Sequence, residues 1–259
     1  MNNTMKSFLA FAVCGMALSL GSCSESDSES NVPTQQEIES AIIGKWKVVK
    51  EKGQKTVTEE RAIFTYTGNG RFTYSAAKLY PDGTFGWDSR TTCTYKVDGN
   101  SLHEDIGRVM SFDSDVLSID ANNLSVNYKN GGATYVMEFA KVTADYSQDV
   151  VGTWEATEYS DGDMEGRDKQ FRVEFRADGT YVYYSNKNGE WVKSEGSSND
   201  YIIDGDWIAM RWSEDNLVSF TIEAWDINEL KDGTMKWSAL RENYDGSRYD
   251  ALLNWKKLR

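Results

Sequence analysis

An internal repeat constrains the fold of this chain more than any other feature of its sequence. Residues 42–46 (IIGKW) recur 108 positions later as residues 150–154 (VVGTW). Residues 95–102 (YKVDGNSL) recur at nearly the same spacing as residues 201–208 (YIIDGDWI). Because the matches follow one another in the same order, we interpret the body of the 259-residue chain as two copies of one structural unit.

Each copy has the pattern of antiparallel β structure. Short runs of alternating apolar and polar residues are separated, about every 8–12 residues, by turn sequences such as TGNG at 67–70 and DG at 204–205. Gly, Asn and Asp tolerate the positive φ angles that tight hairpin turns need. We therefore expect an all-β fold of two tandem antiparallel meander barrels with about eight strands each. The lack of a βαβ pattern argues against most nucleotide-binding folds.

A short helix is expected before each G-x-W sequence. Residues 34–37 (TQQE) form a capping box, in which the Thr hydroxyl and the Glu carboxylate each accept a hydrogen bond from a backbone N–H group. Residues 143–150 are a weaker equivalent in the second copy. A short helix, a G-x-W that opens the first strand and an antiparallel meander together resemble the calycin superfamily. The resemblance is closest to the lipocalin-like domains of bacterial lipoproteins and covers residues 42–142 and 150–258.

The resemblance implies a role for two tryptophans and two lysines. In that family the G-x-W tryptophan plugs one end of the barrel, and a basic residue of the last strand lies across it. Trp46 and Trp154 match the tryptophan, and Lys141 and Lys257 match the basic residue. A cation–π contact of this kind contributes about 1–2 kcal/mol. The domains implied are 34–142 and 143–259.

The N-terminus carries the pattern of an export signal. Lys6 is followed by an apolar stretch of 13 residues at 8–20, too short to span about 30 Å of hydrocarbon as a helix. Residues 20–23 (LGSC) resemble the lipobox of bacterial lipoproteins, which implies a signal peptide at 1–22 and lipidation of Cys23 at the head of a flexible tether, 23–33. The alternative is ordinary cleavage near Ser22, which would leave a secreted protein without lipid.

The tether and the cysteines fit a bacterial cell-envelope location. Residues 24–31 (SESDSESN) are acidic and low in complexity, so they do not bury enough apolar surface to fold alone. They are either a spacer or an export tag, because they resemble the acidic tag that places some Gram-negative lipoproteins on the cell surface. With Cys14 removed and Cys23 lipidated, Cys93 is a lone cysteine and a small core hydrophobe. We expect an outer-membrane lipoprotein, exposed on the surface if the tag is genuine.

Three residues are candidates for contact with a ligand. Glu104 is in register with Leu102 and Ile106, so it either points into the first barrel as a ligand contact or is turned to solvent by a strand end or bulge, which we favour. Trp207 and Trp225 are expected on the outer face by alternation. There they either stack on sugar rings or pack between the two barrels, unless a bulge returns them to the core.

Two functional hypotheses follow. The formal net charge of −13 argues against a nucleic-acid partner, since phosphates select basic surfaces. A lone His103 makes no zinc site, and no cofactor, metal or enzymatic activity is expected. The first hypothesis is a lipid-anchored envelope protein whose two barrels bind a small apolar or amphipathic ligand. The alternative is a surface module for glycans or proteins, with side-chain-filled barrels and no internal ligand.

Overall fold

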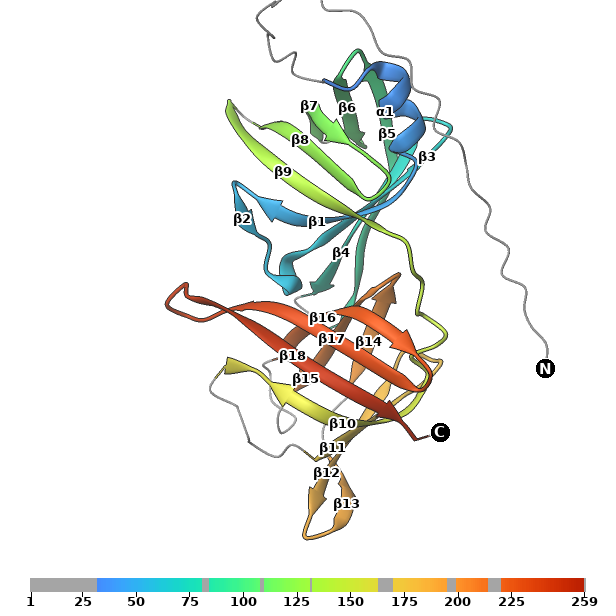
Figure 1. Ribbon diagram of the computed structural model, residues 1–259, viewed down its shortest axis with the longest axis vertical. Helices are drawn as coiled ribbons and strands as arrows, with labels where there is room; N and C mark the ends of the chain where they lie inside the picture. Colours follow the sequence, from blue (N-terminus) through green and yellow to red (C-terminus); the bar gives the residue numbers. More distant parts are fainter. Residues whose placement is uncertain are drawn as a thin grey trace, which may run out of the picture. The chain divides into compact units, whose positions relative to one another are not determined.

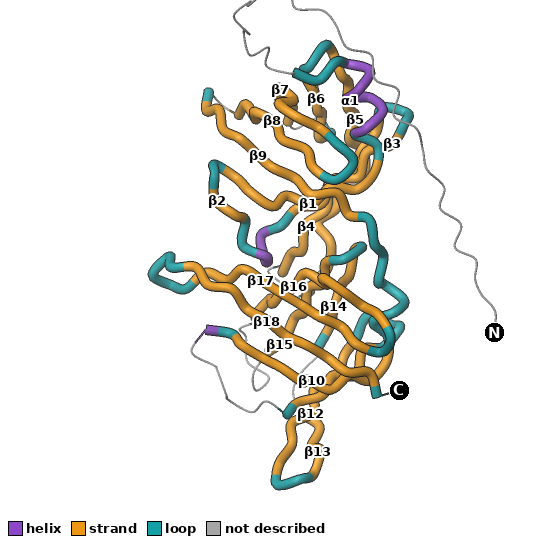
Figure 2. The backbone as a smooth tube through the Cα atoms, in the orientation of Figure 1, coloured by secondary structure: helices purple, strands orange, loops and turns teal. Residues whose placement is uncertain are grey.

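The computed structural model describes residues 32–80, 84–107, 110–130, 132–162, 170–194, 199–213 and 220–258. The expected signal peptide, Cys23 and nearly all of the tether lie outside these residues. Within the described ranges, no helix has both the length and the apolar character needed to cross a membrane. Strands make up most of this part of the chain (Figure 2), which confirms the all-β fold.

The first sheet closes on itself. Its strand order is β2-β1-β3-β4-β5-β6-β7-β8-β9, and β1 also pairs with β9, so eight strands form a barrel with the short β2 attached (Figure 1). We call this the first barrel. Its strands are β1 (Gly44–Glu51), β2 (Gln54–Lys55), β3 (Ala62–Thr67), β4 (Arg71–Leu79), β5 (Phe85–Asp98), β6 (Ser101–Ile106), β7 (Met110–Ile119), β8 (Asn123–Asn130) and β9 (Ala133–Val142).

The second sheet has the same strand path but does not close as a continuous ladder. We call it the second barrel, and its order is β13-β12-β11-β10-β18-β17-β16-β15-β14. Its strands are β10 (Gly152–Ser160), β11 (Phe171–Phe175), β12 (Tyr181–Lys187), β13 (Glu190–Lys193), β14 (Asp200–Asp204), β15 (Trp207–Ser213), β16 (Phe220–Lys231), β17 (Thr234–Glu242) and β18 (Arg248–Lys257).

The two sheets differ because one long strand has been divided. In the first barrel, the 14-residue β5 pairs with β4 on one side and β6 on the other. In the second barrel, β13 pairs with β12 and β14 pairs with β15. In the described residues one isolated bridge, between Thr180 just before β12 and Asp200 in β14, connects the two ends of this sheet. The second sheet is therefore a curled half-barrel, whereas the first is a closed barrel.

One of the two expected helices is present. The helix α1 (Gln35–Ala41) begins with the capping box: Thr34 N donates to Glu37 Oε2 (2.8 Å), and Glu37 N donates to Thr34 Oγ1 (3.4 Å). The helix expected at 143–150 is wrong, because this segment forms a turn in which Val150 N donates to Tyr146 O (3.1 Å). Without a capping box, a segment this short does not offset the cost of helix nucleation.

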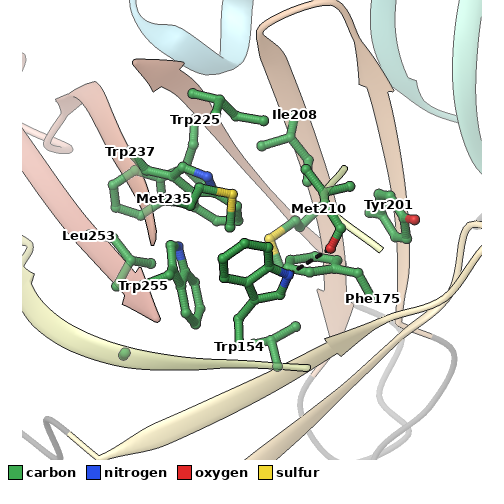
Figure 3. Packing of buried hydrophobic residues seen from close by; sticks show 14 of the residues in the cluster. Trp154, Phe175, Tyr201, Ile208, Met210, Trp225, Met235, Trp237, Leu253 and Trp255 are labelled. Carbon is green, nitrogen blue, oxygen red and sulfur yellow. Dashed lines mark hydrogen bonds between the residues drawn. The ribbon is translucent and has the colours of Figure 1, made fainter. Parts of the chain in front are cut away.

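Each barrel has its own core. The core of the first barrel includes Trp46, Phe72, Leu102 and Cys93, whose thiol is buried. The core of the second barrel includes Trp154, Trp225, Trp237 and Trp255 (Figure 3). A smaller apolar cluster with members from both sheets, among them Ile63, Trp87, Trp207 and Ala224, lies between the barrels.

Candidate functional site

The base of the first barrel is built around Trp46, which is fully buried. Its indole Nε1 donates to Ile42 O (2.6 Å), just after the end of α1. Lys141, on β9, places Nζ 4.8 Å from the centroid of the Trp46 ring and donates to Ala41 O (3.1 Å). Gly44 has φ of +128°, and a Cβ at this position would lie 2.8 Å from Lys141 Cε. The glycine therefore makes room for the lysine that covers the tryptophan.

The second barrel repeats this arrangement. Trp154 is fully buried, and its Nε1 donates to Val150 O (2.7 Å). Lys257 Nζ lies 5.0 Å from the centroid of the Trp154 ring and donates to Asp149 O (3.2 Å). The lysine has a second role at this end of each barrel, because its Nζ also donates a hydrogen bond to a backbone carbonyl just before the first strand. We interpret these contacts as structural, because the lysine ammonium and the indole N–H already have partners within the protein.

Aromatic side chains fill the interior of the second barrel. The Trp237 ring lies 5.9 Å from that of Trp225 and 5.1 Å from that of Trp255, and Phe175 contacts Trp237 at 5.9 Å. Figure 3 shows these rings pointing toward one another from different strands, with Trp154 beneath them. An eight-stranded barrel has room for side chains or for one small ligand, and indoles take that space here.

Trp225 belongs to this interior, so its expected outward position is wrong. The side chain is fully buried, and Nε1 donates to Glu223 Oε1 (2.7 Å). The prediction from alternation was wrong because β16 is buried on both faces. Trp225 and Ile227 face the barrel core, whereas Ala224 and Ile222 face the cluster between the barrels. A strand buried on both faces carries no polar face to mark its outside.

Trp207 is also buried, in the contact between the barrels. It is 1% exposed, its ring lies 5.5 Å from that of Trp87, and Nε1 donates to Thr58 O (3.0 Å). The interpretation of Trp207 as an exposed platform for sugar rings is therefore wrong. Packing between the barrels, which was the other interpretation, is what the structure shows.

Glu104 points into the first barrel. Glu104 is 5% exposed, and its Oε1 accepts a hydrogen bond from Tyr66 OH (2.5 Å). Burial raises the pKa of Glu104 to about 7, and the bond from Tyr66 opposes that rise. The expectation that a strand end or bulge turns Glu104 to solvent is wrong, because β6 pairs without a register shift from Ser101 to Ile106. Unbroken alternation keeps the carboxyl group inside.

Ser114, on β7, is a second polar residue inside the first barrel. It is 1% exposed, and its Oγ has no hydrogen-bond partner within the described structure. Ser114 pairs with Leu102, and Glu104 pairs with Phe112, so Ser114 and Glu104 are diagonal neighbours on adjacent strands, with Cα atoms about 7–8 Å apart. The sequence analysis missed Ser114, although the alternation Phe112–Ser114–Val116 would have placed it inside.

A row of half-buried aromatic rings extends from Glu104 across the adjacent strands. The Phe112 ring lies 5.2 Å from that of Tyr128, and Tyr128 lies 5.4 Å from Tyr135. Burial raises the pKa of Tyr128, and the nearby negative charge of Glu104 raises it further. Lys52 Nζ lies 4.7 Å from the centroid of the Tyr135 ring, at the exposed end of the row. The row is thus a series of contacting side chains that runs from the position of the buried carboxyl group to the surface.

Neither a metal site nor a surface groove for a small molecule is supported by the described residues. No group of His, Cys, Asp and Glu side chains suited to a metal ion occurs among the residues that the structure describes. An open groove of about 290 Å³ lies where the first barrel approaches Arg248, and its lining is mainly polar and charged: Glu51, Lys52, Gln54, Lys55, Thr56, Val57, Glu60 and Arg248. Such a groove lacks the apolar lining typical of a small-molecule site.

Comparison with known proteins supports a lipocalin-like fold. The family model described as a lipocalin-like domain matches residues 150–237, from the VVGTW sequence through the first half of β17. A comparison with curated proteins finds no match. The family match and the barrel-like sheets together suggest a binding protein.

Proposed function

We propose that this protein is a lipid-anchored protein of the bacterial cell envelope whose first barrel binds a small amphipathic molecule. One observation carries the proposal: Glu104 lies inside the first barrel near Ser114, a buried hydroxyl that has no partner among the described residues, and at the inner end of a half-buried aromatic row. Buried polar groups in proteins are normally satisfied by a protein group, an ordered water or a ligand.

The chemistry of the site indicates the kind of ligand. Glu104 and Ser114 offer oxygen acceptors, so the ligand's head group is a hydrogen-bond donor such as an ammonium or a hydroxyl. Phe112, Tyr128 and Tyr135 offer ring faces, which suit an apolar body. A mostly apolar lining with a few convergent polar groups is typical of small-molecule sites. The interior of the second barrel differs, because indoles fill it; among its described residues the buried groups without a partner include the indole N–H groups of Trp237 and Trp255, which are donors and not acceptors.

Calorimetric titration with 1-decylamine and 1-decanol tests the ligand proposal. Decylamine should bind the wild-type protein, and Glu104→Gln should weaken its binding at least tenfold, because the amide keeps the acceptor but loses the charge. Decanol binding should change less. Glu158→Gln, an exposed carboxyl of the second barrel, is the matched control. If neither compound binds the wild type, or if both variants behave alike, the ligand proposal is wrong and a side-chain-filled interaction module becomes the better hypothesis.

The membrane anchor is tested separately. Lipidation of Cys23 would attach two or more acyl chains, which is enough for stable anchoring. Cys23→Ser should therefore move the protein from the membrane fraction to the soluble fraction of the envelope. Retention of the variant in the membrane fraction would contradict the lipid anchor but would leave the ligand proposal untouched.

A further inference from the structure

Strands β16 and β17 of the second barrel separate along part of their length. They pair from Asp226 with Ser238 to Lys231 with Thr234. Beyond this point, β16 continues along β15 and β17 continues along β18. Backbone groups of Ala224 and Leu240 therefore face a gap, which we call the β16–β17 gap. In an uninterrupted sheet, these groups would bond to each other's strand.

A segment of the first barrel fills this gap. The 3-10 helix η1 (Thr58–Glu60) places Thr58, which is fully buried, against both strands. Thr58 Oγ1 accepts from Leu240 N (2.8 Å), and Thr58 O accepts from Trp207 Nε1 (3.0 Å). Glu59 Oε1 accepts from Ala224 N (3.4 Å). Two side chains of the first barrel thus take the place of the missing strand partners.

Arg241 completes the lining of the gap. It is 7% exposed, and its Nη1 donates to Ala224 O (2.8 Å) and pairs with Glu59. The guanidinium also lies 4.4 Å from the centroid of the Trp225 ring. A buried guanidinium needs carboxylate partners. Glu223 (3.4 Å) and Asp161 (4.0 Å) supply them from the second barrel itself, and Glu59 adds one from the first. Four donor groups therefore converge on Thr58 and Glu59, which we call the hydroxyl–acidic segment. The donors are Leu240 N, Ala224 N, Trp207 Nε1 and the guanidinium of Arg241.

Charge complementarity extends around the segment. Lys47 Nζ pairs with Asp206 (2.9 Å) and Asp226 (3.0 Å), and Arg61 pairs with Asp226. Lys45 pairs with Asp204 nearby. In these pairs the cations belong to the first barrel and the carboxylates to the second, the reverse of the pair between Glu59 and Arg241. Because these groups are mostly buried and share partners, they act as a network and not as isolated surface pairs.

We propose that the β16–β17 gap is a docking site for a hydroxyl–acidic peptide segment, occupied in this chain by Thr58 and Glu59. The backbone N–H groups of Leu240 and Ala224 and the indole of Trp207 have these acceptors only when this segment is docked. The two barrels therefore unfold as one cooperative unit, although each has its own core. The residues that match the lipocalin-like model, 150–237, therefore belong to a barrel that needs a segment of the other copy to satisfy these groups.

Hydrogen exchange of the full chain tests the docking site. Thr58→Val removes the acceptor of Leu240 N, and Glu59→Gln removes the charge that faces Arg241. We expect amide exchange at Leu240 to become at least tenfold faster in the Thr58→Val variant and to return to the wild-type rate in Thr58→Ser. Thr56→Val is the matched control, because Thr56 Oγ1 has no partner in the described structure, and exposed Glu60→Gln is the control for Glu59.

Cooperativity is tested by following each barrel in urea. Alkylation of the buried Cys93 reports on the first barrel, and amide exchange of β17 reports on the second. The two transitions should coincide in the wild type, and the β17 transition should move to lower urea in a Thr58→Val/Glu59→Gln double variant. The proposal is overturned if the wild-type transitions are already separate, or if the Thr58 and Glu59 variants match their controls.

Discussion

The buried carboxyl group of Glu104 should make the stability of the protein depend on pH in a defined direction. Its pKa is raised from 4.5 to about 7 in the folded state because burial disfavours the charged form. Two phenols face it from other strands of the barrel, Tyr66 on β3 and Tyr128 on β8, and burial raises the pKa of both, so neither titrates in this range. Among the described residues of this interior, Glu104 is therefore the group that we expect to titrate between pH 4.5 and 8.

The sign and size of the effect follow from linkage. Below pH 4.5, Glu104 is neutral in both the folded and unfolded states, and its contribution to stability is fully present. As the pH rises from 4.5 through about 7, the unfolded chain ionises first, and the free energy of unfolding falls. The difference between the two pKa values corresponds to a loss of about 3 kcal/mol, which levels off above pH 7.

Urea unfolding of the wild type and of Glu104→Gln measures this loss. Gln does not titrate and keeps an acceptor for Tyr66 OH, so the wild type should lose about 3 kcal/mol relative to the variant between pH 4.5 and pH 8. Glu60→Gln, at an exposed position, should show no such change. A difference between wild type and Glu104→Gln that stays constant over this range would refute the reasoning.

Three further substitutions test other contacts. Lys141→Met removes the cation over Trp46 and should lower the free energy of unfolding by about 1–2 kcal/mol in thermal melts, so an unchanged melting temperature would contradict the role given to Lys141. Trp207→Phe keeps a ring but leaves Thr58 O without its donor, and urea unfolding should show a loss of about 1–3 kcal/mol; a neutral result would mean that water replaces the indole. Ser114→Ala should leave stability unchanged or raise it by up to about 1 kcal/mol, whereas a clear loss would reveal a partner for the hydroxyl.

Local sequence signals predict much of the fold. The G-x-W repeats, the Gly, Asn and Asp turns and the alternation between them predict the all-β class and the two barrel-like sheets. The capping box predicts α1, since all its partners lie within four residues. The division of one strand into β13 and β14 was not predicted, because the repeat led us to expect the same strands in both copies.

The candidate site was predicted less completely. Alternation alone places Glu104 inside, but a preference for solvated carboxyl groups overrode it, since an unpaired buried charge is costly. Raising the pKa avoids that cost, as burial favours the neutral form of Glu104. Trp225 was misplaced for another reason, whereas Trp207 lies on the outer face that alternation assigned to it. The strand of Trp225 is covered on both faces, and the sequence of one barrel carries no signal for what the other barrel covers.

The narrow space beneath Lys141 links two positions that are 97 residues apart. Any side chain larger than hydrogen at Gly44 would push the lysine away from the indole and strain a backbone already at φ of +128°. In distant relatives, loss of the glycine should therefore accompany loss of the basic residue near the end of the same copy. Searching for the two as a coupled pair should detect such barrels more selectively than the tripeptide does.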